Sequence, residues 1–266
     1  MEVFQAKAQS NPIPFVRHDS IVRKIWGTSD VVLLIFGGAA AEFALNKAVD
    51  WLYFTGRLPT DPIGRLFSTV TYAKKIIFSS NYVANKTIDA IHDIHKVVEK
   101  NRHSRIPDWA YLDVLYMLIH YSIASFELLE RKLSLEEKYE VYDVFYRFGA
   151  RMKLNDLPTT YDEWLTDRSQ KLNNDLINSD FTIDLFKQYK KNLGGVRYKI
   201  LIEAQKMVIP GSVRQMLGYS KFSFFILLIP LYKISRFLKA DALVKKILFP
   251  AKYYEQIIQL DTKNNR

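Results

Sequence analysis

The chain has 266 residues, a length that one or two domains can fill, and its complete lack of cysteine excludes disulfides, iron–sulfur clusters and thiolate ligation of zinc or haem. Any metal would therefore be bound by histidine or carboxylate. The 38 Lys and Arg outnumber the 28 Asp and Glu, giving a net charge of +10, which suits an anionic partner and plain solubility equally well.

Glycine and proline are scarce, with 10 and 9 residues, so few turns are available and long helices are favoured. No alternating strand pattern, internal repeat or break in composition is visible. We therefore expect a single all-α domain over residues 1–266, in which residues 1–18 form an irregular N-terminal arm.

The first two expected helices run over residues 20–26, capped by Asp19 or Ser20, and over residues 31–54. The second is apolar on nearly every side, which predicts burial. Five consecutive small residues, from Gly37 to Ala41, lie within this helix. They would let a second helix, or alternatively a flat cofactor, approach the backbone closely, and Gly38 is a candidate cofactor-binding residue.

The next helix is expected to begin at Asp61, as the N-cap, with Pro62 in its first position. Arg65 and Thr69 lie four residues apart on one face of this helix. A buried guanidinium needs a partner. A carboxylate of another helix would serve, as would an anionic cofactor.

A further helix, expected from Asn85 or Thr87 to Lys100, contains two of the five histidines. At about 100° per residue, His95 lies at the edge of the apolar stripe and His92 is turned toward the polar side. His95 is therefore the better buried ligand. The alternatives are a buried histidine bonded to a neighbour and a metal held by both imidazoles. The apolar stripe consists of Ile88, Ile91, Ile94 and Val98.

The rest of the chain predicts more helices. Asp108 is expected to cap the most apolar one, residues 109–132, which contains His120 as a core or pocket residue. Later helices are expected to begin at Ser134, at 158–160 and at 179–180, and a helix after Tyr198 to end near Val208, with two more in the C-terminal third.

The apolar run over residues 222–232 is followed by basic residues. We expect a buried helix with a solvated basic face, the alternative being a segment on a membrane surface. No signal peptide or membrane span is predicted, so the expected location is cytoplasmic, with membrane association as the alternative.

Several segments of the chain match, in order, those of a known family. Asp61-Pro-Ile-Gly-Arg65-Leu-Phe-Ser-Thr69 looks like its dPxgRlxxT motif, and His95-Lys-Val-Val98 looks like its HxxV motif. The set resembles the MpaB/rubber-oxygenase catalytic-domain family, which includes the latex-clearing proteins. The other matching segments are residues 20–27, 33–44, 157–161 and 209–214.

The resemblance implies an all-helical, globin-like bundle around a buried pocket for haem b. It implies that His95 is the proximal iron ligand and that Arg65 and Thr69 line the pocket. It also implies a reaction with O2, since the best-known members use O2 to cleave an isoprenoid carbon–carbon double bond. The partners expected are thus O2 and a small apolar substrate, with peripheral membrane contact as an addition and no nucleic acid.

The chain departs from the rubber-cleaving members at three places. Ser68 stands at their lysine position, Lys100 at the family's glycine after HxxV, and Asn46-Lys47 at the usual His-Pro. An isoprenoid- or lipid-like small molecule is therefore a better expectation than polyisoprene. The leading hypothesis is a haem oxygenase. The alternatives are a haem-binding or gas-sensing protein without turnover, a diiron or mononuclear-metal protein, and a basic protein that binds anionic membrane or nucleic acid.

Overall fold

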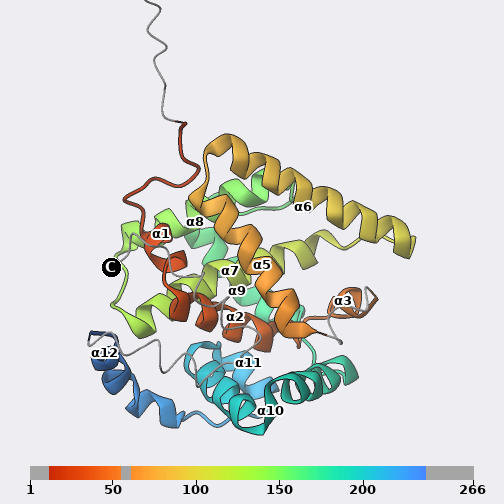
Figure 1. Ribbon diagram of the computed structural model, residues 1–266. Coiled ribbons are helices and arrows are strands. Elements are labelled where there is room, and N and C mark those ends of the chain that lie inside the picture. Colours follow the sequence, from red (N-terminus) through yellow and green to blue (C-terminus); the bar gives the residue numbers. More distant parts are fainter. Residues whose placement is uncertain (1–11, 55–60, 238–266) are drawn as a thin grey trace, which may run out of the picture.

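The computed structural model describes residues 12–54 and 61–237, and every regular element in these ranges is a helix (Figure 1). The all-α class is therefore confirmed. Residues 12–18 are non-helical, as expected of the arm, whereas residues 1–11 of that arm lie outside the described ranges. The helices are α1 (Ile21–Trp26), α2 (Ser29–Phe43), α3 (Asp50–Phe54), α5 (Pro62–Phe78), α6 (Asn81–Arg102), α7 (Asp108–Leu129), α8 (Leu135–Arg151), α9 (Tyr161–Asn174), α10 (Asp180–Val208), α11 (Gly211–Met216), the 3-10 helix η1 (Phe224–Leu227) and α12 (Ile229–Phe237).

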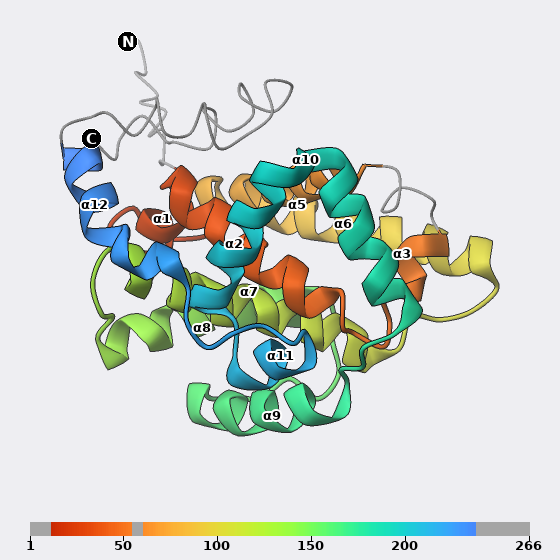
Figure 2. The ribbon, with the colours of Figure 1, turned by 90° about the horizontal axis from the view of Figure 1, so that it is seen from below.

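Helices α2 and α7 pack against each other at the centre of the molecule (Figure 1). Both are apolar on nearly every side, and a helix of that composition is stable only when it is covered all round. Helix α8 packs against α7, and α10 packs against both members of this pair and against α5 of the α5–α6 hairpin. In Figure 2, α9 and α11 are neighbours beneath α7.

The prediction of one continuous helix over residues 31–54 is wrong, because the chain leaves the helix after Phe43 and resumes it at Asp50. Polar contacts replace the helical hydrogen bonds in between. The Asn46 side chain accepts from the backbone N–H of Ala48 at 2.9 Å and donates to Asp113 at 2.7 Å. The backbone N–H of Lys47 donates to the carbonyl of Asp175. Contacts with α7 and with the segment after α9 thus override the apolar pattern.

The predicted helix starts at Ser20, Asp61, Ser134 and Thr160 are confirmed by side-chain oxygens that accept from the first turn. Two others are corrected. Helix α6 begins at Asn81, earlier than expected, because Ser80 caps it. Asp108 is the first residue of α7 and not its cap, since its carboxylate accepts a hydrogen bond from Asn155.

The prediction of a buried helix over residues 222–232 is also wrong. This region forms η1 and the start of α12, and most of its large apolar side chains are exposed. Helix α7 is, by length and composition alone, apolar enough to cross a membrane. In the described structure α7 lies at the centre of the fold and 72% of its most apolar stretch of 18 residues is buried, as in the core helix of a globular domain.

Candidate functional site

The α5–α6 hairpin carries the three polar residues that the sequence singles out. On α5, Arg65 Nη1 donates a hydrogen bond to Thr69 Oγ1 at 3.1 Å, and the Thr69 hydroxyl is 3.3 Å from the Arg65 carbonyl oxygen. Arg65 and Thr69 therefore lie on one face of α5, as expected, and the threonine hydroxyl helps to fix the guanidinium through a hydrogen bond. Arg65 is also close enough to His95 on α6 for its charge to act on the imidazole.

His95 is a neutral imidazole at physiological pH. Its burial, and next the positive charge of Arg65, lower its pKa from 6.5 to about 4, while Glu99 acts in the opposite direction. Its Nδ1 atom is buried and makes no hydrogen bond in the described structure. Several other buried polar atoms also lack a partner, but this is the one imidazole nitrogen among them. A neutral imidazole keeps a lone pair that can bind a metal.

Two residues that the sequence reading missed hold this histidine. The Tyr111 ring packs edge-on against the His95 ring, with centroids 5.2 Å apart. The Tyr111 hydroxyl donates to Glu99 Oε1 at 3.3 Å, and the same oxygen accepts from the backbone N–H of Ile106 at 2.9 Å. Glu99 lies one helical turn after His95, so spacing would have flagged it. Tyr111 comes from α7 and could be found only from the fold.

Gly38 lies at a helix crossing. A Cβ atom on Gly38 would stand 2.4 Å from the ring of Tyr121 on α7 and 3.0 Å from Val208 on α10. The space beside Gly38 is therefore filled by the Tyr121 ring of a neighbouring helix. This corresponds to the helix-packing alternative for the run of small residues. A direct contact of Gly38 with a cofactor stays a prediction.

A second buried polar cluster, also missed, joins α2, α7 and α9. The Arg168 guanidinium donates to both carboxylate oxygens of Glu42, with Nη1 at 2.6 Å, and Tyr121 donates to Glu42 at 2.8 Å. His120 lies beside this pair, and burial lowers its pKa to about 4. It is a core histidine in contact with the Tyr121 ring. Glu42 and Arg168 are 126 residues apart in sequence, which is why no spacing pattern reveals them.

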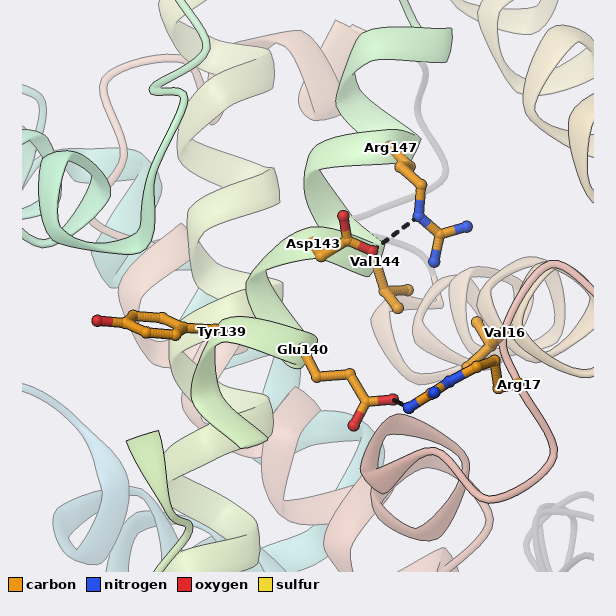
Figure 3. A pocket seen from close by; sticks show the side chains of 7 residues that line it. All are labelled: Val16, Arg17, Tyr139, Glu140, Asp143, Val144 and Arg147. Carbon is orange, nitrogen blue, oxygen red and sulfur yellow. Dashed lines mark hydrogen bonds and ion pairs between the residues drawn. The ribbon is translucent and has the colours of Figure 1, made fainter. Parts of the chain in front are cut away.

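Two surface hollows, of about 390 and 300 Å³, are lined by neither His95 nor Arg65 nor Thr69. The larger lies between α8 and the segment before α1 (Figure 3). Its charges are already paired, Arg17 with Glu140 and Arg147 with Asp143. The other three lining residues, Val16, Tyr139 and Val144, carry no charge, so we assign this hollow no chemistry.

The donor set around His95 fits haem. Haem iron needs a single imidazole from the protein, and its propionates suit a nearby guanidinium. The His95 imidazole would hold the iron, and the Arg65 charge lies near enough to act on that imidazole. In residues 12–54 and 61–237 no three His, Cys, Asp or Glu side chains gather as a metal cage. A diiron site, which takes several carboxylates and histidines, therefore has no counterpart in that part of the chain.

A family model described as the ER-bound oxygenase mpaB/B'/rubber oxygenase catalytic domain matches residues 23–221, three quarters of the chain. No curated protein and no solved structure matches it significantly. The matched region includes Arg65, Thr69 and His95. The chain therefore belongs to the MpaB/rubber-oxygenase catalytic-domain family.

Proposed function

We propose that this member of an oxygenase family is a haem b-dependent enzyme that uses O2 on a small isoprenoid- or lipid-like substrate, with His95 as the proximal iron ligand. The observation that carries the proposal is the buried, unbonded Nδ1 of a neutral His95 beside Arg65, in a chain of this family. We further propose that residues 1–266 form one globin-like haem domain located in the cytoplasm.

The protein groups have separate roles in this proposal. His95 holds the cofactor through its neutral imidazole, and the edge-on Tyr111 ring limits how far that imidazole can rotate. When bound, haem b supplies the iron chemistry that activates O2. The remaining residues bind, orient and shield.

Arg65 supplies a positive charge near the His95 imidazole. In a site with little water, such a charge attracts a carboxylate of the cofactor or substrate, or negative charge that develops on oxygen. Thr69 keeps the guanidinium in place through the 3.1 Å hydrogen bond. Ser68 is exposed and bonds back to the Gly64 carbonyl, so it does not replace the lysine of the rubber-cleaving members.

An absorption spectrum tests the cofactor and its ligand. We expect purified protein to show a haem Soret band that is lost or displaced in His95→Ala and retained in His92→Ala, because the two histidines share one helix but only His95 has the buried nitrogen. Far-UV circular dichroism checks that both variants are folded. An unchanged Soret band in folded His95→Ala would refute the assignment.

Oxygen uptake then separates an enzyme from a sensor. With haem bound, we expect O2 consumption to rise when an apolar polyene such as squalene, or a fatty acid, is added in detergent. Arg65→Ala should reduce that uptake by about 10²- to 10³-fold if its charge is used in the reaction. A stable haem spectrum without uptake on any polyene or lipid would favour the haem-binding or gas-sensing alternative.

A further inference from the structure

The C-terminal end of the described chain exposes an unusual amount of apolar surface. Seven large side chains of η1, α12 and their flanks, here called the apolar C-terminal face, are each between 50% and 70% exposed. Patches of this kind on a folded protein mark interaction sites more often than chance. The face consists of Phe222, Phe224, Ile226, Leu227, Leu228, Leu231 and Ile234.

Polar contacts on the opposite side hold this segment in place. Ser223 donates to the Glu203 carbonyl at 3.0 Å, and the backbone N–H of Phe224 donates to the Glu203 carboxylate at 3.1 Å. Tyr232 donates to Asp30 at 3.0 Å, and Lys233 donates to the Glu130 carbonyl at 3.2 Å. The polar groups of the segment thus face the body of the protein, which leaves the apolar groups outside.

The exposed side chains of α12 share one side of that helix. Leu231 and Ile234 lie three residues apart on α12, the spacing that aligns side chains along a helix, and Leu227 ends the neighbouring η1. Figures 1 and 2 both place α12 at the margin of the molecule, at the end away from α3. A flat partner can therefore reach the face.

The sequence around the face carries much of the positive charge of the chain. Residues 221–266 contain nine Lys and Arg and three Asp and Glu, whereas residues 1–220 contain 29 and 25. An apolar surface within a cation-rich stretch of sequence complements an anionic lipid surface, which offers hydrocarbon below a negative layer. A protein partner of ordinary composition would not require both exposed apolar side chains and an excess of Lys and Arg.

The family match does not account for this region. It ends at Lys221, one residue before the apolar C-terminal face begins. We propose that this face docks the protein peripherally on an anionic membrane, with its Leu, Ile and Phe side chains in the interface, and that the net positive charge of residues 221–266 favours anionic headgroups. The proposal does not depend on haem.

Vesicle flotation with the full chain tests the proposal. Wild type should float with phosphatidylcholine vesicles that contain phosphatidylserine, and much less with phosphatidylcholine alone or in high salt. The variant Leu227→Gln/Leu231→Gln/Ile234→Gln should bind the anionic vesicles at least about tenfold more weakly, because it loses the apolar contacts. The single variant Leu231→Gln should lie between the two, which guards against a folding defect in the triple variant.

A matched control substitutes three residues of similar exposure on other helices, Leu135→Gln/Leu165→Gln/Ile183→Gln, and should bind like wild type. Failure of wild type to bind anionic vesicles would overturn the proposal, as would equal binding by the triple variant. Sedimentation velocity examines a different occupant. A wild-type dimer that the triple variant converts to monomer, without any vesicle binding, would assign the face to a second copy of the chain instead.

Discussion

Among the places where the described chain buries polar atoms, the surroundings of Glu42 and of His95 differ in how those atoms are compensated. Around Glu42, the two carboxylate oxygens accept from Arg168 and Tyr121, so that opposite charges from α2 and α9 cancel within the fold. Around His95, the imidazole is neutral and its Nδ1 has no hydrogen-bond partner. Helix α7 serves both regions, with Tyr111 beside His95 and Tyr121 beside Glu42.

The difference separates a structural site from one that can receive a ligand. A buried charge pair must be complete within the fold, because an uncompensated ion is costly. A neutral imidazole costs far less to leave without a partner, and it gains most when a metal or another ligand takes its lone pair. Arg168 Nε also lacks a hydrogen bond, but the charge of that guanidinium is balanced by Glu42.

The largest effect is expected from breaking the charge pair. Arg168→Met should lower the free energy of unfolding by about 3–5 kcal/mol, since it leaves the Glu42 carboxylate buried without its counterion. Denaturant unfolding measures the loss. The double variant Glu42→Gln/Arg168→Met should recover much of it. A single variant as stable as wild type would mean that Glu42 finds another partner, which would end the contrast between the two regions.

A smaller effect is expected from acid. The folded pKa of His95, about 4, lies below its ordinary value of 6.5, so the unfolded chain binds the proton more readily in that range. The contribution of His95 to stability is therefore complete above about pH 6.5 and is lost as the pH falls toward 4, by up to about 3 kcal/mol. Denaturant titrations of haem-free protein measure it.

His95→Gln is the matched variant for this acid effect, because glutamine does not titrate. The slope of stability against pH should become shallower between pH 6.5 and 4, leaving the share of His120, whose pKa is lowered to about the same value. An identical slope in wild type and His95→Gln would show that His95 is not protected from protonation, and would weaken its role as a neutral ligand.

The sequence predicts these two regions unequally. Local chemistry, such as the caps at Asp61 and Ser134 and the period that favours His95 over His92, depends on neighbours within four residues and can be read directly. The Glu42–Arg168 pair and the Tyr111 contact depend on which helices meet. Haem was reached only through the family resemblance, because a lone histidine has no distinctive spacing.

The apolar pattern gives wrong predictions where the end or the burial of a helix depends on its surroundings in the fold. Residues 31–54 read as one helix, yet Asn46 ends it by bonding to Asp113, a residue 67 positions away. The run over residues 222–232 reads as core, yet its apolar side chains face outward. A periodicity reports which side chains share a face but not whether that face meets the protein or another phase.

The smallest effect tests why α2 and α7 can approach so closely between the two regions. Gly38→Ala should lower the free energy of unfolding by about 1–3 kcal/mol, because the new methyl group would stand 2.4 Å from the Tyr121 ring, which Glu42 holds through its hydroxyl. Gly195→Ala on α10 is the control, since nothing lies within 4 Å of its added carbon and its φ is not positive. If Gly38→Ala instead left stability intact but weakened haem binding, the glycine would belong to the cofactor pocket, and the boundary between the structural region and the ligand-binding region would have to move toward α2.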